Sequence, residues 1–164
     1  MAEQSRQKPQ SQRRGRTERS LRARALAMLA RREHSRLELV RKLAPFSENA
    51  EEVASLLDDF EQRGWLSEHR FIEQVTASRR RRFGASRIAH ELREKGVSDA
   101  AVAGAKSQLM ETELDAARNV WMKKFGTRAT NASERARQIR FMQGRGFSLD
   151  TVLRIMKHDA GDEE

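Results

Sequence analysis

The stretch that decides the fold is RRRRFGASRIAHELREKGVS, residues 79–98. Four arginines and a Phe-Gly pair precede a segment in which the apolar residues Ile88 and Leu92 are four apart, so they share one face of a helix. Gly96 follows, and a glycine just past a helix readily adopts the left-handed conformation that ends it. We therefore expect a helix over residues 86–95 with a turn on either side.

The end of this stretch recurs 50 residues later, because Gly96-Val97-Ser98 corresponds to Gly146-Phe147-Ser148. A backward offset of 49 residues relates apolar residues of this region to an earlier copy, which is more divergent because Pro45-Phe46-Ser47 stands in place of the glycine motif. Self-similarity at a fixed period indicates a repeat architecture. The matched apolar pairs are Phe71 with Trp121, Ile72 with Met122, Val75 with Phe125, Leu92 with Met142, Val97 with Phe147, Val102 with Val152, Ile88 with Leu39, Leu92 with Leu43 and Val102 with Val53.

The rest of the chain has dense helix signals and no strand pattern. Ser35 with Glu38 has the spacing of a capping box, as do Asn49 with Glu52 and Asn131 with Glu134. Helices are expected over 18–32, 36–43, 50–63, 68–82, 86–95, 99–110, 112–125, 132–144 and 149–158. The predicted fold is all-α, with three tandem three-helix repeats forming an elongated, curved array. The repeats span 20–66, 67–111 and 112–158, between a disordered basic tail at 1–19 and an acidic tail at 159–164.

Composition and motifs argue against several classes of function. The 164 residues are 35% charged and include no cysteine, which excludes disulfides and thiolate chemistry. The histidines are scattered, and no phosphate-binding loop or catalytic constellation is present, so we expect a protein that is not an enzyme and has no cofactor or metal. No apolar run is long enough to span a membrane, and no secretory signal is evident. We expect a monomeric cytoplasmic protein.

The net charge of +9 is distributed unevenly. Residues 1–24 hold eight basic residues against two acidic ones, residues 79–95 seven against two, and residues 118–145 eight against one. The helix over 50–63 is acidic. Two basic zones inside the folded part predict a polyanionic or acidic partner.

The arginine run stands at the expected end of a helix. Successive helical residues turn by about 100°, so Arg79 and Arg82 should share a face while Arg80 and Arg81 splay to either side. The alternative is that these arginines have no role in binding and form a solvated helix end whose positive charge complements the helix dipole. The functional interpretation gains support because the basic surface continues along the next helix and recurs in the third repeat, at Arg87, Arg93, Lys95, Lys123, Lys124, Arg135, Arg140 and Arg145.

A helix-turn-helix reader of DNA sequence is disfavoured. The third helices of the first two repeats are acidic or hold a single lysine, whereas recognition helices present Asn, Gln, Ser and Arg to base edges. Contacts with the DNA backbone remain open, and a DNA-binding module is the second hypothesis.

Three segments together resemble the RecX regulatory proteins, modulators of the RecA recombinase. They are RREHSRLELVRKL at 31–43, RRRRFGASRIAHELREKGVS at 79–98, and KKFG at 123–126 with ERARQIRFMQGRGFS at 134–148. The resemblance covers roughly residues 20–158. Ala85 stands where many members have proline, and the tail at 1–19 lies outside the shared region.

The resemblance implies three tandem three-helix repeats that bind along the groove of the RecA filament on single-stranded DNA. Blocked filament growth, with less ATP hydrolysis, strand exchange and co-protease activity, is the expected result. Some members also bind DNA directly. The family's basic, partner-facing character maps onto Arg79, Arg80, Arg81, Arg82, Arg87, Arg93 and Lys95, and onto Lys123, Lys124, Arg135, Arg140 and Arg145.

Overall fold

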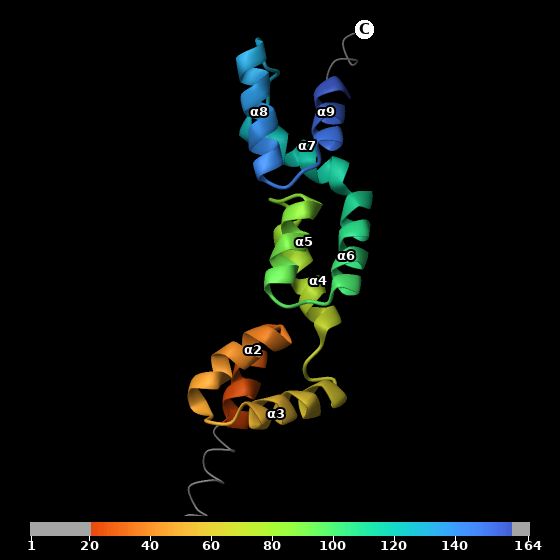
Figure 1. Ribbon diagram of the computed structural model, residues 1–164. Helices are drawn as coiled ribbons and strands as arrows, with labels where there is room; N and C mark the ends of the chain where they lie inside the picture. Colours follow the sequence, from red (N-terminus) through yellow and green to blue (C-terminus); the bar gives the residue numbers. More distant parts are fainter. Residues whose placement is uncertain (1–20, 159–164) are drawn as a thin grey trace, which may run out of the picture. The chain divides into compact units, whose positions relative to one another are not determined.

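The structure, a computed structural model, describes residues 21–158, which form helices joined by turns and contain no strand (Figure 1). The predicted tails at 1–19 and 159–164 lie outside this range. A helix covers 21–29, and the other elements are α2 (Arg36–Leu43), η1 (Ala44–Phe46), α3 (Ala50–Gln62), α4 (Glu68–Arg79), α5 (Ala85–Glu94), α6 (Asp99–Glu111), α7 (Glu113–Lys124), α8 (Ala132–Gly144) and α9 (Leu149–His158). The all-α repeat fold is thus confirmed.

Two predicted helix ends were wrong. The first helix stops at residue 29 rather than 32, and α4 stops at Arg79 rather than Arg82. After Arg79 the chain tightens, because the N–H groups of both Arg82 and Phe83 donate to the Arg79 carbonyl. The next donor, Gly84 N–H, bonds to the Arg145 carbonyl of the following repeat. The predicted common helical face of Arg79 and Arg82 therefore does not exist.

The chain divides into two compact units, one up to Ser67 and one from Glu68 onward. The first unit has a single apolar core, and the second has two, one in each of its repeats. Most of the residues paired by the offsets of 50 and 49 are buried in these cores: Phe71, Trp121, Ile88, Leu39, Leu92, Met142, Leu43, Val97, Phe147, Val102, Val152 and Val53. Ile72, Val75 and Phe125 are partly buried beside them, whereas Met122, the partner of Ile72, is 51% exposed. The repeat register read from the sequence is confirmed by this burial.

The predicted helix caps are present, with one change in detail. Ser35 and Glu38 form the full capping box. Asn49 and Asn131 also cap their helices, but the carboxylates expected to close those boxes bond to Ser47 and Thr130 instead. The turn glycines Gly64, Gly96, Gly126 and Gly146 all have positive φ.

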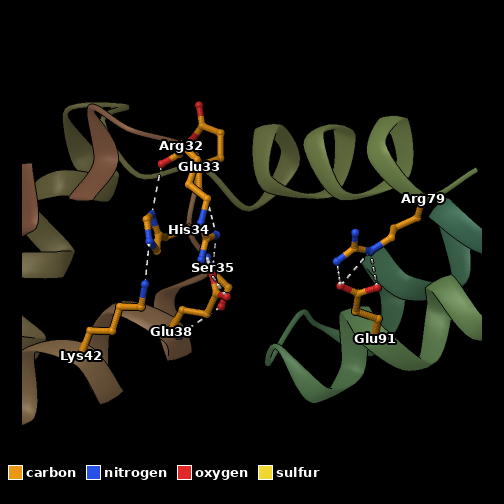
Figure 2. A network of polar contacts seen from close by, with 8 residues as sticks. All are labelled: Arg32, Glu33, His34, Ser35, Glu38, Lys42, Arg79 and Glu91. Atoms are coloured by element: carbon orange, nitrogen blue, oxygen red, sulfur yellow. Dashed lines mark hydrogen bonds and ion pairs between the residues drawn. The ribbon is translucent and has the colours of Figure 1, made fainter. Parts of the chain in front are cut away.

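The start of α2 is fixed by a compact polar cluster in the first unit (Figure 2). The His34 imidazole is buried; its Nδ1–H donates to the Arg32 carbonyl, and its Nε2 accepts from Lys42 Nζ at 3.2 Å. Arg32 donates to the Glu38 carboxylate through both terminal nitrogens. A neutral imidazole supplies the donor and the acceptor that this arrangement needs.

The acidic helix α3 is largely neutralised inside its own unit. Arg36 forms salt bridges with Asp58 at 2.7 Å and with Glu61 at 2.9 Å. Asp59 forms salt bridges with Arg22 at 3.0 Å and with Arg63 at 2.8 Å. Hydrogen bonds from Arg63 and then Arg22 lower the pKa of the Asp59 carboxyl. The acidic residues of the C-terminal half of α3 are therefore paired locally.

The two repeats of the second unit meet backbone to backbone. Gly84 is buried at the N-terminus of α5, and a methyl group on it would overlap the Gly146 carbonyl and the Phe147 nitrogen. Gly146 has φ +89, and a side chain there would collide with Arg87. The Gly84 N–H donates to the Arg145 carbonyl at 2.8 Å across this contact. Only glycine at both positions allows so close an approach.

Glu113, the first residue of α7, binds both repeats from a buried position. Its carboxylate accepts the Ala85 N–H at 3.1 Å and the Thr151 hydroxyl at 2.8 Å. It thereby caps α5, whose own N-cap residue has no side chain, and holds the first turn of α9. A carboxylate at a helix N-terminus is also favoured by the helix dipole.

Glu68, the first residue of α4, holds the start of another helix within its own repeat. Its carboxylate accepts the backbone N–H and the hydroxyl of Ser98, at the start of α6. In both repeats, then, the opening glutamate of the first helix holds the start of the third.

We predict that Gly84→Ala destabilises the second unit by about 2–3 kcal/mol, because the methyl group has no room against the backbone of Gly146. Gly104→Ala is the matched control: it lies inside α6 with open space around it, so alanine should be neutral or stabilise by about 0.5–1 kcal/mol. Urea unfolding followed by Trp121 fluorescence, with Trp65 replaced by Phe, measures both. Equal effects of the two substitutions would contradict the close contact.

We also predict that His34 makes the first unit less stable in acid. Burial lowers the pKa of His34 from its usual 6.5, since the charged imidazole would lose hydration beside Arg32 and Lys42. The unfolded chain therefore binds more protons between about pH 6.5 and the lower folded-state pKa. The contribution of His34 to stability is complete above this window and falls as the pH falls through it, by at most about 1.4 kcal/mol per pH unit.

His34→Gln, which keeps a neutral donor and acceptor, should remove this part of the pH dependence. Urea unfolding monitored by Trp65 fluorescence, in a Trp121→Phe background, is the measurement. Parallel pH curves for the parent and the His34→Gln chain would refute the role of His34.

Candidate partner-binding groove

Three helix C-termini converge in the second unit, and each carries basic residues. Arg80–Arg82 follow α4, Lys123 and Lys124 end α7, and Arg145 is the C-cap residue of α8. Cations are favoured at such ends, because the last carbonyls of a helix carry partial negative charge. The junction at Gly84 and Gly146 holds the ends of α4 and α8 together.

These ends surround a groove of about 750 Å³. Its lining contains six basic residues and one acidic residue. The full lining is Arg80, Arg81, Arg82, Thr112, Asp115, Ala116, Asn119, Val120, Lys123, Lys124, Phe141 and Arg145. The structure thus brings the two basic zones of the sequence, which are about 40 residues apart, into one site.

The six basic groups of the groove have no carboxylate partner within the described part of the chain. Arg80, Arg81, Arg82, Lys123 and Lys124 are exposed. Arg22, Arg36 and Arg63 of the first unit and Arg79 of the second, in contrast, each pair with a carboxylate. The groove therefore concentrates uncompensated positive charge.

The floor of the groove is apolar. Ala116 and Val120 lie one turn apart on α7, and Phe141 of α8 packs edge-on against Phe125 with ring centroids 5.3 Å apart. Arg145 and Lys124 lie over the Phe141 ring, at 5.1 and 5.5 Å from its centroid. Cation–π attraction of this kind holds long side chains in place at the edge of an apolar surface.

Arg79 is separated from the rest of its run. Its guanidinium forms a paired contact with the Glu91 carboxylate of α5, at 2.9 Å from Nε (Figure 2). The hydrogen bonds and charge of Glu91 raise the pKa of Arg79. Arg79 does not line the groove, and its observed contact joins α4 to α5 within one repeat.

Arg87 also has an internal contact, since it donates to the Gly144 carbonyl at 3.1 Å and lies over the Phe83 ring. Arg145 reaches back to the Arg82 carbonyl at 3.5 Å. Both arginines thus cross the junction between the repeats. The other predicted residues outside the groove are Arg93, Lys95, Arg135 and Arg140, and their role in binding stays a prediction.

Sequence reasoning missed the parts of the groove that are not basic. Thr112, Ala116 and Val120 follow one another at intervals of four along α7, as do Asp115 and Asn119. This spacing defines a stripe on one helix face, which was the available signal. No feature of the neighbouring sequence indicated that this stripe faces the arginine run of the preceding repeat.

No grouping of His, Asp and Glu within residues 21–158 is suited to hold a metal ion. None of the helices in that range is long and apolar enough to cross a membrane. The groove offers positive charge and apolar surface, which is the chemistry of a binding site.

Two family models match the second unit. The model for the second three-helix domain of RecX matches residues 67–105, and the model for the third matches residues 111–156. The regulatory protein RecX of Ralstonia nicotianae is 46% identical over 149 residues, covering 88% of this chain and 94% of the relative. That of Chromobacterium violaceum is 40% identical over 144 residues, covering 88% and 93%.

Solved structures support the fold. The crystal structure of RecX from Lactobacillus salivarius gives a TM-score of 0.75 at 13% identity, covering 88% of this chain and 97% of that one. A crystal structure of regulatory protein RecX gives 0.73 at 19% identity, covering 87% and 73%. With relatives at this identity along most of its length, the chain belongs to the RecX family of regulatory proteins.

Proposed function

We propose that this chain binds the RecA filament on single-stranded DNA in the cytoplasm and inhibits RecA. The activities lowered would be ATP hydrolysis, strand exchange and co-protease activity, with effects on recombination and the SOS response. Family membership supports a regulatory role. The observation that carries the proposal is the groove, because six cations without acidic partners lie together on the two repeats that the family models match.

The proposed mode of action is binding without catalysis. Repeated three-helix units suit a polymer whose subunits also repeat, since several weak contacts made together give a high overall affinity. Uncompensated positive charge raises the rate of encounter with an acidic partner and makes binding sensitive to salt. Both features fit a regulator of a filament.

A double charge reversal in the groove tests the proposal. We predict that Arg81→Glu with Lys123→Glu raises the concentration needed to halve DNA-dependent ATP hydrolysis by RecA at least about tenfold, because two attractive contacts become repulsive. The pair Arg154→Glu with Lys157→Glu, on exposed positions of α9 outside the groove, makes the same change in net charge and should shift this concentration by less than about threefold.

The assay uses RecA from the same organism, with circular dichroism to confirm that both variants keep their helices. Absence of inhibition by the parent chain at any concentration would sink the proposal. Inhibition only when the parent chain saturates the DNA would instead favour an independent DNA-binding module, as would equal losses in the two variants.

A further inference from the structure

We propose that the groove binds a short acidic segment of a partner protein, with apolar side chains on the groove floor, in preference to nucleic acid. This rests on the proposed function and deepens it, because it assigns the groove to a protein surface of the filament rather than to its DNA. The inference follows from the combination of rim, floor and walls in one site.

The rim is suited to carboxylates. Arg80, Arg81 and Arg82 project from one turn, and each guanidinium can hold a carboxylate through two parallel N–H donors. Lys123 stands on the α7 side of the same groove. A segment with several Asp or Glu residues therefore finds partners on both sides of the groove.

The floor is suited to apolar side chains. Ala116, Val120 and Phe141 are each partly buried and pack on the core of the last repeat, leaving part of their surface toward the groove. An acidic segment with Leu or Phe between its acids would cover this surface and gain hydrophobic free energy. Thr112 and Asn119 add polar groups that can bond to a peptide backbone.

The groove is less suited to single-stranded nucleic acid. Proteins that bind single strands stack successive bases on exposed aromatic rings, and the lining contains one ring only. That ring, Phe141, already packs against Phe125 and lies beneath Arg145 and Lys124. The site lacks the row of stacking surfaces that bases require.

The walls of the groove are formed before any partner binds. The Gly84–Gly146 contact and the buried Glu113 carboxylate hold the repeats in register, and Phe83 lies under both Arg87 and Arg145. A volume of about 750 Å³ falls within the roughly 300–1,000 Å³ of sites that enclose a small ligand, so it accommodates a short segment. Rigid walls reduce the ordering cost of binding.

Three fluorescein-labelled probes of equal charge test this inference by anisotropy with the full chain at physiological salt. They are a peptide of Asp and Glu interspersed with Leu, the same peptide with Ser for each Leu, and oligothymidylate. We expect the leucine peptide to bind about tenfold more tightly than the other two, because only it places apolar groups on the floor.

Two variants locate the bound peptide. Val120→Thr changes the floor with little change of volume or charge, and should weaken the leucine peptide about fivefold while leaving the serine peptide unchanged. Arg81→Glu with Lys123→Glu should weaken both peptides at least tenfold. The matched pair Arg154→Glu with Lys157→Glu should weaken them less than threefold. Peptide bound elsewhere on this basic chain would not respond selectively to the groove pair.

Equal affinity for the leucine and serine peptides would overturn the inference. So would tighter binding of oligothymidylate that the groove variant abolishes, which would make the groove a nucleic-acid site. Failure here is distinct from failure of the proposed function. If the chain inhibits RecA but does not prefer the leucine peptide, only the inference about the groove is refuted. If it prefers the peptide but does not inhibit RecA, only the proposed function is refuted.

Discussion

The second unit depends on the contact between the backbones of Gly84 and Gly146. Any side chain at either position would push the two repeats apart. The short distance between the repeats is therefore possible because both residues are glycine. Once the backbones are this close, the Gly84 N–H reaches the Arg145 carbonyl and the Ala85 N–H reaches the Glu113 carboxylate. Neither donor then needs water, and satisfied buried donors are what make such a close interface stable.

The groove is a consequence of this junction. Holding the start of α5 against the end of α8 brings the C-termini of α4, α7 and α8 together, and each ends in basic residues. The cations balance the partial negative charge of three helix ends, which explains how they can lie together without acidic partners. A purely structural role would leave the apolar floor unexplained, since Ala116, Val120 and Phe141 are only partly covered. The geometry favours a site that a partner completes.

The sequence was sufficient for features that are local or periodic. Caps at Ser35 and Asn131 depend on residues a few positions apart, and the register of the repeats depends on identical spacing in two copies. Glu113 was not predictable, because its burial results from groups 28 and 38 residues away and nothing near it in the chain differs from an exposed helix start. The two basic zones were likewise identified from the sequence, but their meeting in one groove was not, because it depends on contacts between residues far apart in the chain.

The four consecutive arginines show why charge counts alone do not locate a site. Arg79 is still helical and faces Glu91, which lies one helix further along the same repeat, so its charge is used internally. The helix then ends, and the tightened turn carries Arg80, Arg81 and Arg82 to the groove instead of around a helical cylinder. The difference between the first arginine and the next three thus arises from where α4 stops, and the chain beyond that point is bound to the following repeat through Gly84.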